Sequence, residues 1–385
     1  MSLLVYKFKY APDPAGTSFT ELANVQEITY EIGRQQQLDQ YAASRALIVA
    51  RYPSGYASPI TSLVTGNAAQ IVNSPGTGFT FTGTISNVTV KYGIPYASNV
   101  GPADYIFIQL EGNFARLGRA QGGSYAMAAA DTWTQVSNCK TQSGVDTYWS
   151  NAGSGSTNPQ LSATTVDGTW ADWAGKMLQT NNGRMWDCSS PNLVDFISPF
   201  YLSALTPSTI NFSDTTNNST NQVYDQIEFR SLADNYYTQV TVTPEAVAAQ
   251  TATLTGATTP YRVLNLNTLN STTSQATDFA NYYVGLYGQQ SFGLASISCV
   301  AEAQNVFRLD KIGVNSAYGL ATCPGLQINV TFRGTTITAI VEGVSVTATP
   351  GHARFTYYFS SAALNDILIL NNTVFGKLNQ NRLGY

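Results

Sequence analysis

Charge is scarce in this chain. Only 11% of its 385 residues are Asp, Glu, Lys or Arg, against roughly a quarter in ordinary globular proteins. The net charge is −4 and no run of basic residues occurs, which argues against specific nucleic-acid binding, because gripping phosphates needs grouped Lys and Arg. The polar surface must come from Thr, Ser, Asn, Gln and Tyr, a mixture that favours strands and turns over helical bundles.

Histidine and paired cysteines are also scarce. His352 is the only histidine, so a histidine metal cluster is excluded and a Ser-His-Asp arrangement would depend on this one residue in a predicted turn. The four cysteines are far apart and include no CxxC pair, so we interpret them as buried free thiols: Cys139, Cys188, Cys299 and Cys323. Walker, dinucleotide and EF-hand motifs are missing. The sequence therefore predicts no metal, no cofactor and no enzymatic activity.

Long apolar runs are missing as well. The segment from Met1 to Tyr6 has neither a long apolar core nor a small-residue cleavage site, so we expect no secretory signal. No stretch approaches the ~18 consecutive apolar residues of a membrane span. The sequence predicts a protein made in a cytoplasm and without a membrane span.

What is present is a succession of strand patterns separated by turn residues. In residues 79–92 the apolar side chains lie first at odd positions (Phe79, Phe81 and Ile85) and then at even positions (Val88, Val90 and Tyr92). They can stay on one face of the sheet only if the strand contains one extra residue, so we expect a bulge near Ser86-Asn87. Residues 105–110 are apolar on nearly both faces, which is typical of a central strand, and a short helix is predicted at 111–119. Further strands are predicted at 3–8, 44–51, 326–333, 335–341, 344–349 and 354–359. Arg333-Gly334 suits a tight turn, and Glu342-Gly343 suits either a connection or a bulge.

Two longer helices and one short helix are predicted elsewhere. Residues 170–180 carry Trp170, Trp173 and Met177 at helical spacing, and residues 276–287 carry a second apolar stripe. A short helix is expected around 361–370. The pattern is mainly β with an α+β insert, and we divide it into a first β module at 1–119, a middle α/β subdomain at 120–222 and a second β module at 223–385.

The middle segment contains the candidate binding residues. Trp170, Trp173 and Trp186 lie near Asp172 and Asp187, a combination that could form a glycan or partner contact, or a pair of carboxylates for glycan hydrolysis. The alternative is that the tryptophans form the core of this subdomain and the acids cap or solvate its surface. We favour the alternative, because sequence alone does not show whether the rings are exposed.

Several short strings follow one another in order along nearly the whole chain. They are Ile32-Gly33-Arg34-Gln35, Phe81 to Val88, Phe114 to Arg119, Asn182-Gly183-Arg184-Met185-Trp186-Asp187, Ser231 to Tyr236, Thr238 to Pro244, Val341-Glu342-Gly343-Val344, Phe355 to Tyr358 and Phe375 to Tyr385. In this order they resemble minor tail proteins of long-tailed bacteriophages. The similarity is not found in the insert at 121–165.

The resemblance implies a tail-hub architecture with two small β-barrels flanking the middle subdomain. A trimer with two barrels per chain would present six quasi-equivalent barrels to a six-fold tail tube. The implied partners are the tail tube and other tail-tip proteins, and genomic DNA would pass through the lumen without specific binding. The implied location is the tail tip of the virion, after synthesis in the host cytoplasm. Alternatives are a receptor- or carbohydrate-binding tip protein, a cell-wall or polysaccharide hydrolase, and a capsid or decoration protein.

Overall fold

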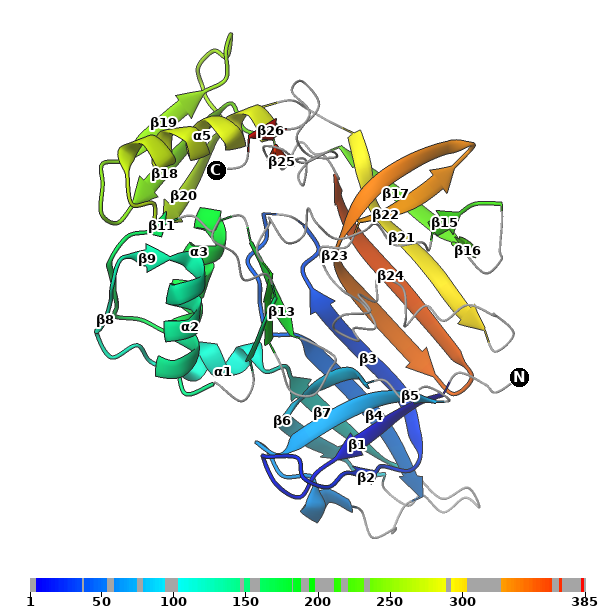
Figure 1. Cartoon of the computed structure of the whole chain (residues 1–385). Coiled ribbons are helices and arrows are strands. Elements are labelled where there is room, and N and C mark those ends of the chain that lie inside the picture. The colour runs from blue at the N-terminus through cyan, green and yellow to red at the C-terminus, as the bar shows by residue number, and fades with distance from the viewer. Residues whose placement is uncertain are drawn as a thin grey trace.

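The structure is a computed structural model that describes most of the chain. The described residues are 5–36, 38–53, 59–74, 79–93, 103–145, 149–152, 160–181, 183–187, 194–197, 211–215, 221–231, 236–288, 292–302, 327–361, 367–368 and 382–383. A large β-sheet fills one side of the molecule, and the helices gather on the other side together with smaller sheets (Figure 1).

The N-terminal half of the large sheet is antiparallel and runs in the order β3-β4-β7-β6-β5-β1-β2. Its elements are β1 (Val5–Tyr10), β2 (Thr20–Glu21), β3 (Val25–Gly33), β4 (Arg45–Pro53), the 3-10 turn η1 (Pro59–Ser62), β5 (Ala68–Ser74), β6 (Phe79–Lys91) and β7 (Ala103–Glu111). The predicted bulge is confirmed: the register of β6 against β7 shifts between Ile85 and Asn87. The predicted central strand is β7, which lies between β4 and β6 and buries Ile106, Ile108 and Leu110 on one face.

The C-terminal half contains β15 (Asn211–Ser213), β16 (Asn221–Val223), β17 (Gln226–Ser231), β21 (Phe292–Glu302), β22 (Gln327–Phe332), β23 (Thr335–Thr349) and β24 (His352–Ser361). The tight turn between β22 and β23 is confirmed: Arg333 and Gly334 have φ of 49° and 81°, the positive values that a two-residue hairpin turn requires. The two strands expected at 335–341 and 344–349 are one strand, β23, with a bulge between Val341 and Gly343. Of the two interpretations of Glu342-Gly343, the bulge is the correct one.

The two halves join into one sheet. β23 pairs antiparallel with β3, from Gly343 opposite Gly33 to Ala348 opposite Ile28. We call this pairing the seam. At Gly343 a Cβ atom would lie 2.5 Å from the carbonyl oxygen of Arg34, so the seam requires glycine there. The described strand pairs form an open path and close no barrel. The two predicted barrels are therefore not confirmed, because each half satisfies an exposed edge by pairing with the other half.

The middle segment packs helices against short strands. It contains α1 (Phe114–Arg119), β8 (Tyr125–Met127), β9 (Ala130–Asp131), α2 (Thr132–Gln142), β10 (Trp149–Ala152), β11 (Gln160–Leu161), β12 (Thr164–Val166), α3 (Trp170–Asn181), β13 (Arg184–Asp187) and β14 (Val194–Ile197). The helix predicted at 111–119 is confirmed as α1, which begins three residues later at Phe114, and the helix predicted at 170–180 is confirmed as α3. α3 starts at a reciprocal cap, in which Thr169 N–H donates to Asp172 Oδ2 at 3.0 Å and Asp172 N–H donates to Thr169 Oγ1 at 3.2 Å.

A small α/β unit interrupts the C-terminal half between β17 and β21. It consists of β18 (Gln239–Pro244), β19 (Gln250–Thr253), β20 (Val263–Thr268) and α5 (Thr273–Tyr287). The predicted apolar stripe is confirmed, because Ala276, Phe279, Ala280, Tyr283 and Tyr287 are all buried. They pack on Val240, Val242, Ala252 and Leu266 of the small sheet.

The remaining expectations concern boundaries and the C-terminus. The core of the large sheet draws residues from both predicted β modules, and the boundaries at 119/120 and 222/223 stay a prediction. Most of the helix expected at 361–370 lies outside the described residues. Those that are described do not form it: Ser361 ends β24, and β25 (Ile367–Leu368) pairs in parallel with β26 (Arg382–Leu383).

Candidate functional site: a buried ion cluster and an adjoining cavity

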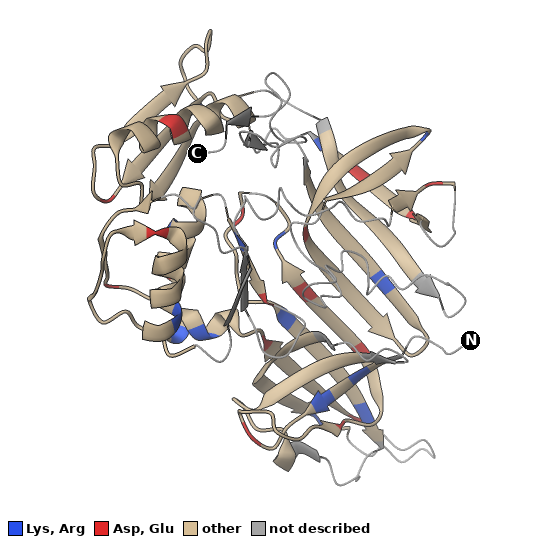
Figure 2. Cartoon of the chain, in the orientation of Figure 1, with Lys and Arg blue, Asp and Glu red and all other residues tan. Residues whose placement is uncertain are grey.

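The bulge of β23 carries a fully buried carboxylate. Glu342 is 0% exposed, and its oxygens accept hydrogen bonds from Arg34 Nε at 2.8 Å and Arg184 Nη2 at 2.8 Å. The Ser360 hydroxyl also donates to Glu342 Oε1. We call Arg34, Arg184, Glu342 and Ser360 the ion cluster. Charged residues are thinly spread over the rest of the fold (Figure 2), so a charge buried in the core needs a specific explanation.

The ion cluster ties together three segments that are remote in sequence. Arg34 follows β3, and its backbone N–H donates to the Glu342 carbonyl at 3.0 Å. Arg184 begins β13 of the middle segment, and Glu342 lies at the seam. One carboxylate thus connects both halves of the large sheet and the middle segment.

The electrostatics of the ion cluster depend on all three charges. Burial opposes ionisation of Glu342, but Arg184 and Arg34 outweigh it and hold the pKa of this carboxyl at about 2. Burial likewise opposes the charged form of Arg34, whereas Glu342 raises its pKa above the ordinary value. The Arg34 guanidinium lies 4.4 Å from the centre of the Tyr41 ring, a cation–π contact. The cluster therefore stays ionised throughout the physiological range.

A second buried carboxylate joins the middle segment to the N-terminal half of the sheet. Asp187, at the end of β13, accepts the backbone N–H of Ser44 at 2.7 Å and that of Phe114 at 2.6 Å. Burial raises the pKa of Asp187 to about 6, although these N–H groups act in the opposite direction. A Cβ atom on Gly112 would lie 2.2 Å from Asp187 Oδ2, so glycine is needed beside the carboxylate.

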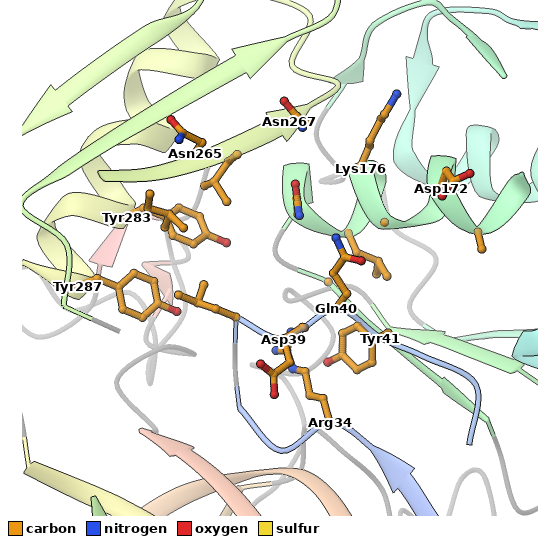
Figure 3. A pocket seen from close by; sticks show the side chains of 18 of the residues that line it. Arg34, Asp39, Gln40, Tyr41, Asp172, Lys176, Asn265, Asn267, Tyr283 and Tyr287 are labelled. Carbon is orange, nitrogen blue, oxygen red and sulfur yellow. The ribbon is translucent and has the colours of Figure 1, made fainter. Parts of the chain in front are cut away.

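A cavity of about 440 Å³ adjoins the ion cluster. Its walls come from the loop after β3, from α3, from β20 and from α5 (Figure 3). Tyr283 and Tyr287 project into it from α5, with ring centroids 5.7 Å apart. Burial raises the pKa of Tyr287 well above its ordinary value, so its hydroxyl stays a hydrogen-bond donor. Sequence reasoning did not find this cavity, because its walls meet only in the folded chain.

The three candidate tryptophans are not at the cavity surface. Trp170, Trp173 and Trp186 are 1%, 3% and 2% exposed. Trp170 and Trp173 pack edge to face in the core of the middle segment, whereas Trp186 belongs to the core of the large sheet. None presents an indole face to solvent in this structure. A glycan or partner contact through these rings stays a prediction that would require the local structure to open.

The two acids considered for hydrolysis have structural hydrogen bonds. Asp172 caps α3 through Thr169, and these bonds lower its pKa. Asp187 is buried on backbone N–H groups. His352 is exposed at the first residue of β24. We see no geometry that unites these three residues into one reacting centre.

Among the described residues, no group of three or more His, Cys, Asp or Glu side chains is arranged to hold a metal ion. Cys139 and Cys299 are buried free thiols, as predicted, and Cys188 and Cys323 lie outside the described residues. No helix in the described part of the chain is long and apolar enough to cross a membrane.

The charged residues of the ion cluster were present in the sequence strings but were not recognised as a unit. Each lies in an apolar context: Ile32-Gly33-Arg34, Arg184-Met185-Trp186 and Val341-Glu342-Gly343-Val344. In a chain so poor in charge, a charged residue inside an apolar strand is a signal of a buried ion pair.

Comparison with known proteins gives structural neighbours only. No protein-family model and no curated protein matches the sequence. The structure is similar to the tail protein from Neisseria meningitidis MC58, with a TM-score of 0.62 and 10% identity over 94% of this chain and 98% of that one. It is also similar to the 43 kDa tail protein of prophage MuSo2 from Shewanella oneidensis, with a TM-score of 0.60 and 9% identity over 92% and 98% of the two chains.

A third similar structure is the prophage tail protein gp18 from Listeria monocytogenes EGD-e, with a TM-score of 0.50 and 8% identity over 93% of this chain and 96% of that one. At such low identity the likeness concerns the fold, and it extends over nearly the full length of all three neighbours. The chain has the fold of phage tail proteins.

Proposed function

We propose that this protein is a structural component of a phage tail tip, a hub-like minor tail protein that connects the tail tube to distal tip or receptor-binding proteins. The observation that carries the proposal is the seam. It makes both β halves one continuous sheet, and the ion cluster fixes the middle segment to that sheet. A continuous sheet fixed in this way would transmit mechanical force between the tail tube on one side and the distal tip proteins on the other. The full-length likeness to phage tail proteins supports the same role.

A trimer is the assembly that this architecture favours. The two halves of the sheet share a feature: each contains a long strand with a bulge, β6 at Ser86 and β23 at Glu342. Three chains would present six such halves, which matches the six-fold symmetry of a tail tube. A surface with few charges suits this role, because buried charges at every joint would have to be desolvated.

The remaining parts of the proposal follow from composition. The net charge of −4 would let genomic DNA pass through a central lumen without specific binding. The location would be the virion tail tip, after synthesis in the host cytoplasm. We propose no enzymatic activity, and a role as a receptor- or carbohydrate-binding tip protein is the second candidate. The cavity beside the ion cluster favours that candidate and is treated below.

Sedimentation of the purified protein tests the assembly. We expect a trimer in analytical ultracentrifugation and co-sedimentation of that trimer with isolated tail tubes of the phage. Gold-labelled antibodies should mark the distal end of the tail in intact particles. A protein that stays monomeric at high concentration and labels the capsid would contradict the proposal.

A further inference from the structure

The cavity beside the ion cluster has the size of a ligand site. Its volume of about 440 Å³ falls in the range of roughly 300–1,000 Å³ that is typical of small-molecule pockets. Most of its walls come from the loop after β3, from α3, from β20 and from α5 (Figure 3), and Phe114 of α1 also lines it. The structural role proposed above does not require a cavity at this place.

The charged groups around the cavity are already engaged inside the protein. Arg34 pairs with Glu342, and Lys176 on α3 pairs with Glu245. Asp39 accepts the backbone N–H of Gln36 at 2.9 Å, while Asp172, also at the wall, serves as the cap of α3. An anion or a cation entering the cavity would have to compete with these contacts. The cavity is therefore suited to a neutral ligand.

Some neutral polar side chains at the wall, unlike the charged ones, have no hydrogen-bond partner among the described residues. Gln40, Gln179, Asn265 and Asn267 line the cavity, and their side-chain amides make no hydrogen bond with the described part of the protein. Tyr287 is only 6% exposed, and its buried hydroxyl also has no hydrogen-bond partner among the described residues. Figure 3 shows this hydroxyl on the side of the ring that points away from α5, toward the loop that carries Asp39 and Gln40.

We infer that the cavity binds a neutral saccharide unit. A sugar presents many hydroxyl groups in a compact volume, and amides and a phenol can both donate to and accept from them. A buried hydroxyl without a partner is costly, and a sugar hydroxyl would supply the missing partner of Tyr287. Leu38, Leu264 and the Tyr283 ring add apolar wall against which the C–H face of a sugar can pack.

The test is saturation-transfer NMR on the purified full-length protein with a panel of glucose, galactose, N-acetylglucosamine and lactose. At least one of these neutral sugars should give a signal at millimolar concentration. Glucuronic acid, which has a carboxylate, should bind more weakly, because the two cations at the wall, Arg34 and Lys176, are already paired with Glu342 and Glu245 and would leave that carboxylate without a partner. Tyr287→Phe and Gln40→Ala should each weaken binding about three- to tenfold, the effect of losing one neutral hydrogen bond.

Asn87→Ala is the matched control, because Asn87 is an exposed amide at the β6 bulge in the other half of the sheet. It should leave sugar binding unchanged. Tyr287→Phe should keep or raise the melting temperature, since the hydroxyl it removes has no partner in the protein. The inference is overturned if no neutral sugar binds, or if Tyr287→Phe and Gln40→Ala bind as wild type does. Either result leaves the structural role untouched, because sedimentation and tail labelling test that role separately.

Discussion

Replacing Glu342 by Gln removes the negative charge that joins the three segments of the fold. Arg34 and Arg184 are only 10% and 4% exposed at their side chains, so solvent does not substitute for the lost carboxylate. Breaking a buried ion pair by removing one partner typically costs about 3–5 kcal/mol. The pKa supports that scale, because a decrease from the ordinary 4.5 to about 2 corresponds to roughly 3 kcal/mol of stability at neutral pH.

The assay is urea unfolding monitored by circular dichroism, with Glu21→Gln as the control. Glu21 forms an exposed pair with Lys7 at 3.0 Å, with side chains 47% and 37% exposed, and its replacement should cost less than about 1 kcal/mol, because solvent screens such a pair. The control therefore removes one carboxylate from an ion pair without disturbing the core.

The pH dependence gives an independent readout. The folded-state pKa of Glu342 is lowered, so its contribution is fully present above about 4.5 and is lost as the pH falls through about 2. The free energy of unfolding of wild type should therefore approach that of Glu342→Gln as the pH falls from about 4.5 to about 2. Equal stabilities of Glu342→Gln and Glu21→Gln at pH 7 would refute the role of the ion cluster, as would an advantage of wild type that does not change between pH 5 and pH 2.

Three further predictions concern the seam, the second buried carboxylate and the tryptophans. Gly343→Ala should destabilise the protein by about 1–3 kcal/mol, because its Cβ would press on the backbone of Arg34; Gly175→Ala in α3, with open space at its Cβ, should stabilise by about 0.5–1 kcal/mol in the same thermal melts. The pKa of Asp187 is raised from 3.8 to about 6, so the native state binds more protons than the unfolded state between these values. The stability of wild type relative to Asp187→Asn should therefore fall by about 2 kcal/mol as the pH rises from 4 to 6. A difference that stays constant in urea titrations over this range would contradict this. Trp173→Ala should cost about 3–5 kcal/mol as a buried truncation, and an unchanged melting temperature would mean that the ring is a surface contact after all.

Local features were predictable from sequence because they are encoded within a few residues. The parity change at Ser86-Asn87 predicted the β6 bulge, and the stripe from Ala276 to Tyr287 predicted the buried face of α5. Arg333-Gly334 predicted a tight turn that needs positive φ. Periodicity and turn chemistry act over distances shorter than one element.

Long-range pairing was not predictable in this way. The register of Gly343 opposite Gly33 depends on which edge strands meet, and strand periodicity specifies a face of a sheet but not a partner. The expectation of two separate barrels is not confirmed for this reason. The ion cluster was missed for the same reason, since Arg34, Arg184 and Glu342 are adjacent only after the three segments have packed.

The central claim is that this chain is a structural part of the tail tip, and cryo-EM reconstruction of the tail in the phage that carries it tests this claim most directly. We predict density for the chain at the distal end of the tail tube, in three copies, with the seam and the ion cluster intact. Density on the capsid, or a tail tip whose reconstruction has no place for this fold, would contradict the account.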